Sequence, residues 1–176
     1  MIFTELPLVG AYLIDLEPRR DERGFFARAF CEDEFQKLGL KAGIVQANLS
    51  QNVRKGTVRG LHYQRAPHAE AKLVRCVHGA IYDAIIDLRP NSPTYLRWTS
   101  VELTRENRSM LYVPEGFAHG FQTLVPDVEV HYLVTEFYTP AFEAAIRWND
   151  PLFGIAWPLA DVTLSPKDAV HPDFQP

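Results

Sequence analysis

The chain has 176 residues, and its 18 basic side chains against 22 acidic ones give a formal charge of −4. This length suits a single domain, residues 1–176, whose core is large enough to need no disulfide or metal for stability. The mild acidity excludes a general nucleic-acid binder, which needs a strongly basic surface to neutralise phosphates. No apolar run reaches the roughly 18 residues of a membrane span, and the two cysteines, Cys31 and Cys76, are too few for a disulfide framework. We therefore expect a cytoplasmic protein with no signal peptide and no membrane partner.

The predicted elements are short strands with almost no helix. Each predicted strand is rich in β-branched and aromatic residues and lies between glycine or proline turn signals. The helix Glu32–Leu38 follows the first strand, with an acidic first turn and Gly39 as the residue that ends it. In chain order the predicted strands are Tyr12–Leu16, Lys72–His78, Ala80–Leu88, Thr99–Leu103, Ser109–Val113, Gly120–Leu124 and Val128–Thr135. This pattern is typical of an all-β antiparallel sandwich or barrel with a ligand site inside, and we expect the residues after about Thr139 to pack back over it.

A dense cluster of polar side chains lies at Arg59–Gln64, and Lys72 follows it. If this segment is an extended strand, His62 points to one face and Arg59 to the other. A bend at Gly60 could bring Arg59 and His62 to one site. A single histidine in a strand is most often structural, but basic, imidazole and amide groups gathered in apolar surroundings favour a functional site.

A second cluster is Pro114–Gly120, in which a proline–glycine turn precedes His119. The spacing P-x-G-x-x-H resembles the second signature of cupin barrels. The first cupin signature has two histidines spaced H-x-H and usually a metal, whereas this chain has His62 followed by a tyrosine and a glutamine. A carboxamide is a poor ligand for a divalent transition metal, so we expect no metal, although His62, Glu70 and His119 could still form a three-ligand site.

Two further groups could supply acid–base chemistry. Tyr132 and Tyr138 are ordinary packing residues unless a phenol faces a polar pocket, where it could donate a proton. The segment Ser165–Asp168 is typical of a solvated turn, but a carboxylate returning from the C-terminal region could orient a histidine. The sequence therefore offers a base, an acid and an orienting carboxylate without showing that they meet.

Taken together, these motifs resemble the dTDP-4-dehydrorhamnose 3,5-epimerase family over essentially the whole chain. Each matching stretch is weak alone, but all of them in this order are highly specific. The stretches are Asp21–Phe26, Gln46–Asn48 with Ser50, Gly56–Gln64, Lys72–Val74, Asp87–Arg89 with Ser92–Thr94, Pro114–Phe121, Trp148–Pro151 and Ser165–Asp168.

The resemblance implies a cupin-type β-barrel, usually a homodimer whose N-terminal strands cross between subunits, with no metal or organic cofactor. It implies an isomerase that takes a nucleotide-linked 4-keto-6-deoxy sugar and inverts the carbons on either side of the ketone, as in dTDP-rhamnose biosynthesis. His62 matches the family's base, and Asp168 matches the carboxylate paired with it. Tyr132 matches the proton donor, and Lys72 matches the cation near the keto oxygen. The positions that match substrate contacts are Arg23, Arg28, Gln46, Ala47, Asn48, Arg59, His119, Glu143 and Lys167.

These roles are chemically consistent. A C–H bond beside a ketone is a weak acid, so the enolate needs stabilisation where its charge appears, and the Lys72 ammonium would supply it. An imidazole titrates near working pH and suits a base, with Asp168 to hold its tautomer. Inversion needs a second group across the sugar ring, for which Tyr132 is the candidate. Arg23 and Arg59 can fork onto the oxygens of a diphosphate.

One position departs from the family pattern. Arg28 stands where well-known members carry a glutamate, which reverses a charge at a position associated with substrate. This leaves a single-site 3- or 5-epimerase acting on a different nucleotide-linked 4-keto sugar as an alternative. Two further alternatives are a metal-dependent cupin oxygenase and a catalytically silent sugar-binding barrel, which metal analysis and deuterium exchange would distinguish.

Overall fold

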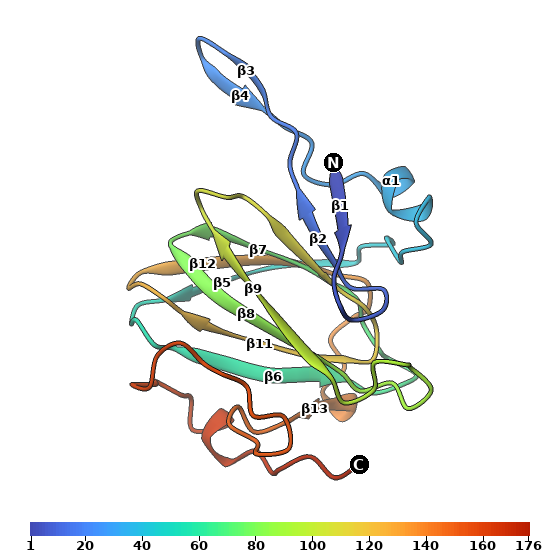
Figure 1. Ribbon diagram of the computed structural model, residues 1–176, viewed down its shortest axis with the longest axis vertical. Coiled ribbons are helices and arrows are strands. Elements are labelled where there is room, and N and C mark those ends of the chain that lie inside the picture. The colour runs from blue at the N-terminus through green and yellow to red at the C-terminus, as the bar shows by residue number, and fades with distance from the viewer.

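The computed structural model describes residues 1–176 and consists mainly of two antiparallel sheets that pack face to face (Figure 1). The six-stranded sheet has the order β1 (Ile2–Glu5), β2 (Tyr12–Asp15), β10 (Met110–Val113), β7 (Lys72–His78), β12 (Val128–Val134) and β5 (Gln46–Asn52). The five-stranded sheet has the order β13 (Glu143–Ala145), β6 (Val58–Gln64), β11 (Phe117–Thr123), β8 (Ala80–Asp87) and β9 (Trp98–Thr104). The remaining elements are a hairpin of β3 (Arg19–Asp21) and β4 (Gly24–Phe26), the helix α1 (Glu32–Gln36), and the 3₁₀ turns η1 (Pro140–Phe142) and η2 (Asp168–Val170).

The prediction of an all-β antiparallel fold is confirmed, but the sheets are not closed into a barrel. The edge strands of one sheet, β1 and β5, share no ladder of hydrogen bonds with β13 and β9, the edge strands of the other. Of the two predicted forms, sandwich or barrel, the chain therefore has the open sandwich. Alternation of side chains along a strand shows which face is buried, but it does not show whether two edge strands meet.

All seven predicted strands correspond to observed strands, and β7 agrees at both ends. The strands β1, β3, β4, β5 and β13 were not predicted, and β6 was considered only as a possibility. In β5 the polar residues Gln46, Asn48 and Gln51 outnumber the large apolar ones, so the segment lacks the usual strand signal. Its partner β12 provides the hydrogen bonds that keep it extended.

The core between the sheets results from alternation along the strands. On β7 the side chains of Val74 and Cys76 point inward, and on β12 that of Val130 does so, all packed against buried residues of β8, β9 and β11. Lys72 and Tyr132 continue these inward rows toward one end of the sandwich, because side chains two residues apart share a face. The inner face thus changes from apolar to polar along the same strands. The cavity lies at the polar end.

The helix α1 covers the outer face of the six-stranded sheet near β2 and β10. Its Phe35 is buried and packs edge-on against the rings of Phe3 and Tyr112. Acidic residues occupy the first turn, and the chain reverses at Gly39, whose φ is +69°. The predicted helix is therefore confirmed, although it ends at Gln36 rather than at the predicted Leu38.

Two segments extend beyond the sheets (Figure 1). The β3–β4 hairpin projects away from the sandwich past β1 and β2, and its Phe26 is 68% exposed. The C-terminal segment runs along the outer side of β6, where Ile146 and Phe153 pack against Leu61. The prediction that the C-terminal residues pack back over the sheets is thus confirmed. No helix in the chain has the length and apolar character required to cross a membrane.

Candidate active site

A divided cavity lies between the two sheets, at the end where their inward positions become polar. Its larger part has a volume of about 390 Å³ and its smaller part about 220 Å³. His62, Lys72 and Tyr132 line both parts. They come from β6, β7 and β12, so the sheet topology brings three of the four predicted catalytic residues into one cavity.

The path of β6 determines where His62 lies. Gly60 has φ +120°, and a Cβ at this position would lie 2.6 Å from the Cα of Gly120 on β11, so only glycine permits the close approach. The pairing of β6 with β11 shifts register in this stretch. The irregularity places Arg59 along the same cavity as His62, which is the outcome expected from a bend at Gly60.

A buried carboxylate holds the His62 ring. Asp168 is 4% exposed, and its Oδ1 lies 2.6 Å from His62 Nε2. Ser165 donates its hydroxyl to Oδ2 at 2.9 Å and accepts the Asp168 amide at 3.0 Å. Burial acts to raise the pKa of Asp168, but hydrogen bonds from His62 and Ser165 outweigh it, so the pKa lies below its ordinary value. An ionised carboxylate can only accept, so His62 carries its proton on Nε2 and keeps the lone pair of a base on Nδ1.

The Lys72 ammonium is fixed inside the cavity by a neighbouring carboxylate. Lys72 Nζ lies 3.1 Å from Glu70 Oε1, and both side chains are largely buried. Lys72 belongs to the six-stranded sheet and His62 to the five-stranded one, yet both face the same cavity. A carbonyl compound between them would therefore have a cation and a base within the same enclosed space.

Tyr132 adds a proton donor on the wall that carries Lys72. Burial raises the pKa of Tyr132, and the Glu70 carboxylate raises it further, while Arg59 acts in the opposite direction. The phenol therefore keeps its proton at neutral pH and can donate it. Because β12 and β6 belong to opposite sheets, Tyr132 and His62 face a molecule in the cavity from opposite sides.

A second histidine–carboxylate pair lines the smaller part of the cavity. His119 Nε2 lies 2.6 Å from Asp83 Oδ1, and Asp83 is completely buried on β8. The other carboxylate oxygen of Asp83 has no hydrogen-bond partner. The structure thus places His119 in the cavity, and the buried Asp83 fixes the orientation of its ring. Imidazoles that contact metals or substrates are commonly held in this way.

The strand β5 presents alternate side chains to the cavity. Gln46 and Asn48 line the larger part, and Ser50 lines the smaller part. The Ser50 hydroxyl is buried and has no hydrogen-bond partner, so it is free to bind a ligand. Ala47 lies on the opposite, exposed face of β5, and its methyl group does not reach the cavity.

An ion pair borders the larger part of the cavity. Lys167 Nζ lies 2.7 Å from Glu143 Oε2, and Tyr138 donates its hydroxyl to the same oxygen at 3.0 Å. The hydrogen bond from Lys167 is the main cause that lowers the pKa of Glu143. Arg59, beside the smaller part, donates Nε to Asn52 Oδ1 at 2.6 Å. Of the predicted substrate-binding cations, Arg59 and Lys167 therefore lie at the cavity or its border.

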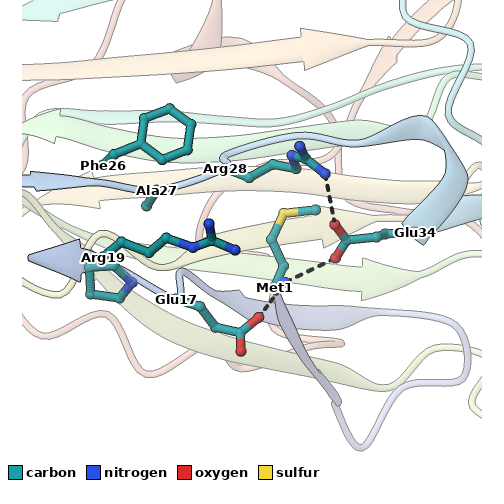
Figure 2. A pocket seen from close by; sticks show the side chains of 8 residues that line it. Met1, Glu17, Arg19, Phe26, Ala27, Arg28 and Glu34 are labelled. Carbon is teal, nitrogen blue, oxygen red and sulfur yellow. Dashed lines mark hydrogen bonds and ion pairs between the residues drawn. The ribbon is translucent and has the colours of Figure 1, made fainter.

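Arg23 and Arg28 lie elsewhere. Arg23, in the turn of the β3–β4 hairpin, pairs with Asp21 at 2.6 Å. Arg28 lines a separate hollow of about 460 Å³ beside the N-terminus, where its guanidinium is 3.9 Å from Glu34 (Figure 2). Neither residue lines the cavity that contains His62. A single chain thus does not bring these two predicted substrate contacts to its own site.

The N-terminal amino group pairs with two carboxylates in the hollow. The Met1 amino group lies 2.7 Å from Glu17 and 2.9 Å from Glu34, as the dashed lines in Figure 2 show. The hydrogen bond to Glu17 is the main cause that raises the pKa of the amino group. Both carboxylates that line this hollow are engaged in these ion pairs, which we interpret as structural.

The carboxamide of Gln64, which replaces the second cupin histidine, fixes a loop. Its Oε1 accepts the Thr139 amide at 2.6 Å, and its Nε2 donates to two backbone carbonyls. Glu70 and His119 have the partners described above, and their ligand atoms do not gather with those of His62. The three-ligand arrangement considered for a cupin metal is therefore not formed.

Sequence reasoning missed two residues that contact the site histidines. Asp83 holds His119, and its signal was an acidic residue in the middle of a mainly apolar strand, because a buried charge requires a partner. His171 lies three residues after Asp168, and its Nε2 is 3.3 Å from Asp168 Oδ1. The pairing of Glu70 with Lys72 had no comparable signal, since it depends on how the chain enters β7.

Comparisons with known proteins agree with this geometry. The profile of the dTDP-4-dehydrorhamnose 3,5-epimerase family matches residues 5–176. A dTDP-4-dehydrorhamnose 3,5-epimerase from Methanothermobacter thermautotrophicus is 47% identical over 94% of this chain and 90% of its own length. The crystal structure of a Bacillus anthracis protein of the same name, with TDP and PPi bound, has a TM-score of 0.94 at 40% identity and covers 98% of this chain and 99% of its own.

A second solved structure shows the family with a sugar nucleotide. A Legionella pneumophila epimerase in complex with dTDP-4-keto-L-rhamnose has a TM-score of 0.90 at 35% identity and covers 99% of each chain. The likeness spans the entire two-sheet arrangement, so the predicted cupin-type jelly-roll class is confirmed. The names of these relatives do not favour the single-site alternative. This chain belongs to the dTDP-4-dehydrorhamnose 3,5-epimerase family.

Proposed function

We propose that the chain is an isomerase that inverts C3 and C5 of dTDP-4-dehydro-6-deoxy-D-glucose to give dTDP-4-dehydro-L-rhamnose. The observation that carries the proposal is the placement of His62 and Tyr132 on opposite sheets, with Lys72 in the same cavity. Inversion requires that a proton leave one face of the sugar ring and return to the other. Two proton-transfer groups on opposite walls meet that requirement directly.

The first step removes a proton from a carbon beside the C4 ketone. His62 Nδ1 accepts the proton, and the electron pair of the C–H bond moves into an enolate with its negative charge on the ketone oxygen. Asp168, 2.6 Å from Nε2, stabilises the imidazolium that forms and keeps the ring from rotating.

The second requirement is stabilisation of the enolate. The Lys72 ammonium faces the cavity and is largely withdrawn from bulk water, where its attraction for a new negative charge exceeds that of an exposed lysine. The carboxylate of Glu70 holds the ammonium in place before the substrate binds. The position of the cation is thus preorganised, so little reorganisation is needed when the charge develops.

The third step returns a proton from the opposite face. The Tyr132 hydroxyl, protonated at neutral pH because burial raises its pKa, donates to the carbon and restores the ketone. Water then removes the proton from His62 and reprotonates the phenolate, which resets the site. Both inverted carbons flank one ketone, so the same three side chains serve C3 and C5 in turn.

We infer that the nucleotide is held partly by a second copy of the chain. Arg59 and His119 line the smaller part of the cavity, where a diphosphate can bind a guanidinium bidentately. Arg23 and Arg28 lie on or after a projecting hairpin and reach a cavity only in another copy. Exposure of the Phe26 ring on that hairpin supports a homodimer, because a protruding aromatic side chain is stabilised by burial against a partner.

The proposed compartment is the cytoplasm. Cys31 and Cys76 are unpaired, which is consistent with a reducing environment. The proposed partners are the nucleotide-sugar substrate and a second copy of the chain, and the proposed reaction needs neither a metal nor an organic cofactor.

Isotope exchange tests this function. The chain, treated with EDTA and incubated with dTDP-4-dehydro-6-deoxy-D-glucose in heavy water, is expected to add two deuterium atoms to the sugar, which mass spectrometry detects. One deuterium would indicate a single-site epimerase. No exchange would contradict the proposal, and activity that returned only with added iron would favour the oxygenase alternative.

The role of His62 is tested in the same assay. His62→Asn removes the lone pair at Nδ1 and is expected to slow deuterium incorporation at least about 100-fold. His78→Asn is the matched control, because it removes an exposed imidazole at the end of β7, outside the cavity. Exchange at the full rate in His62→Asn would show that another group is the base.

A further inference from the structure

Three potential metal-ligand atoms meet behind the cavity, on the side of His62 that faces the C-terminal segment. The ring nitrogens of His62 and His171 and a carboxylate oxygen of Asp168 all lie within 4.8 Å of one another. His62 comes from β6, whereas Asp168 and His171 belong to the 3₁₀ turn η2 and the residue after it. No step of the proposed reaction uses His171.

The spacing of these atoms suits a tetrahedral zinc ion. Zinc bonds of about 2.0–2.2 Å to nitrogen and oxygen separate neighbouring ligand atoms by about 3.3 Å. His171 Nε2 already lies 3.3 Å from Asp168 Oδ1, while His62 Nε2 lies 2.6 Å from the same oxygen. The His62–Asp168 separation must increase by a few tenths of an ångström, and the two imidazole nitrogens, which lie within 4.8 Å of each other, must both face the ion.

The donor types and their surroundings also fit zinc. Two imidazoles and one carboxylate form the ligand set of many three-ligand zinc sites, which leave a fourth position for water. The far oxygen of Asp168 is held by the Ser165 hydroxyl at 2.9 Å, the kind of outer hydrogen bond that orients a ligating carboxylate. His171 Nε2 is buried, and its 3.3 Å contact with Asp168 Oδ1 lacks the geometry of a hydrogen bond.

An ion can reach this cluster. The His62 side chain is 34% exposed and borders both parts of the cavity, whereas Asp168 and His171 are largely buried. His62 is therefore the ligand through which the cluster meets solvent.

We propose that His62, Asp168 and His171 form a binding site for Zn²⁺, and that the bound ion inhibits the enzyme. The inhibition rests on the proposed role of His62. Zinc bound at Nε2 takes the lone pair of that nitrogen, and the proton that Nε2 carried moves to Nδ1 by exchange through water. The neutral ring then carries its proton on Nδ1 and has no lone pair left with which to accept a proton from the sugar.

Direct metal binding tests the site independently of catalysis. Chain stripped with EDTA and desalted is titrated with Zn²⁺ by calorimetry, and with Co²⁺ by the absorption of its tetrahedral complex. We expect one ion per chain and an affinity at least about tenfold weaker in His171→Gln. His171→Cys supplies a thiolate donor and is expected to recover part of the affinity, whereas His78→Gln, the matched control on the exposed surface, should bind as the unaltered chain does.

The deuterium-exchange assay tests the inhibition. Micromolar Zn²⁺ is expected to suppress exchange by the unaltered chain, EDTA should restore it, and His171→Gln should need at least about tenfold more Zn²⁺ for the same fractional loss. Equal affinity and equal zinc sensitivity in the unaltered chain and His171→Gln would overturn the proposal. If the ion binds through His171 but the stripped chain shows no exchange, the zinc site stands and the proposed function fails.

Discussion

Asp87 shows how partners close in the sequence hold a buried charge in this fold. The Arg89 guanidinium binds both of its oxygens, at 2.8 and 2.7 Å, and the hydroxyls of Ser92 and Thr94 donate to Oδ2. Burial acts to raise the pKa of Asp87, but these hydrogen bonds lower it to about 2. The segment Asp87–Thr94, which carries part of the family resemblance, therefore closes the turn after β8 and does not line the cavity.

Asp87→Asn is expected to lower the free energy of unfolding by about 2 kcal/mol at neutral pH, because a pKa lowered from 3.8 to about 2 corresponds to that much stabilisation. The folded-state pKa lies below the unfolded one, so the stabilisation is complete above about pH 4 and is lost as the pH falls toward about 2. Urea unfolding at several pH values should show the two chains converging in acid.

Asp21→Asn is the control for this measurement. Asp21 is also paired with an arginine, Arg23, but the pair is exposed and screened by water. The substitution Asp21→Asn should therefore change the free energy of unfolding at neutral pH less than Asp87→Asn does. If the difference in free energy of unfolding between the unaltered chain and Asp87→Asn stayed constant down to about pH 3, the pKa assigned to Asp87 would be contradicted.

At the scale of elements, β6 connects the fold to the chemistry. One side of the strand packs Leu61 into the apolar cluster beneath the C-terminal segment, and the other carries His62 into the cavity. Gly60 permits both, because its φ of +120° and its contact with the backbone of β11 exclude a side chain. The position of the base therefore depends on a residue that has no side chain of its own.

Gly60→Ala is expected to reduce the free energy of unfolding by about 2 kcal/mol or more, since the added methyl would lie 2.6 Å from the Cα of Gly120 in a strained backbone conformation. Separation of β6 from β11 should also displace His62 and reduce epimerase activity. Thermal unfolding and the exchange assay measure the two effects. The matched control is Gly43→Ala, which meets open space and should change stability by less than about 0.5 kcal/mol. Equal effects of the two substitutions would refute the close approach.

At the scale of the whole molecule, the predicted site is divided between two places. The cavity with its base, cation and acid lies between the sheets, while Arg23 and Arg28 lie at the projecting hairpin and beside the N-terminus (Figures 1 and 2). In the proposed two-fold dimer, each hairpin would complete the cavity of the other chain, so that both sets of residues would meet one substrate. The positive charge of Arg28 would then attract the nucleotide bound in the other chain's site.

Mixing two defective chains tests this arrangement. His62→Asn and Arg23→Ala are expected to be strongly impaired as pure proteins. If the chains exchange freely, an equal mixture is expected to recover about a quarter of the normal sites, because each mixed dimer contains one site without either defect. Recovery is measured by deuterium exchange after unfolding and joint refolding. An activity no greater than the average of the two pure variants would show that Arg23 serves its own chain or none.

Much of the site could be named before the structure was known. His62, Lys72 and Asp168 belong to motifs whose residue types suit a base, a cation and an orienting carboxylate. The structure places His62 and Lys72 along one cavity and Asp168 in contact with His62. In the structure Lys72 shares the inward face of β7 with the apolar Val74, two residues further along the strand. Asp83 and His171 were missed because their importance depends on contacts with strands or turns far away in the sequence.

The sequence by itself determined the local properties of this protein: the alternation of its strands, the helix before Gly39 and the chemical character of its polar clusters. Tertiary structure alone decided that the two sheets stay open, that His62 and Tyr132 stand on opposite walls, and that Arg23 and Arg28 lie away from both. The physical reason is that side-chain periodicity arises within a single strand, whereas register, sheet edges and shared cavities depend on pairing between segments far apart in the chain.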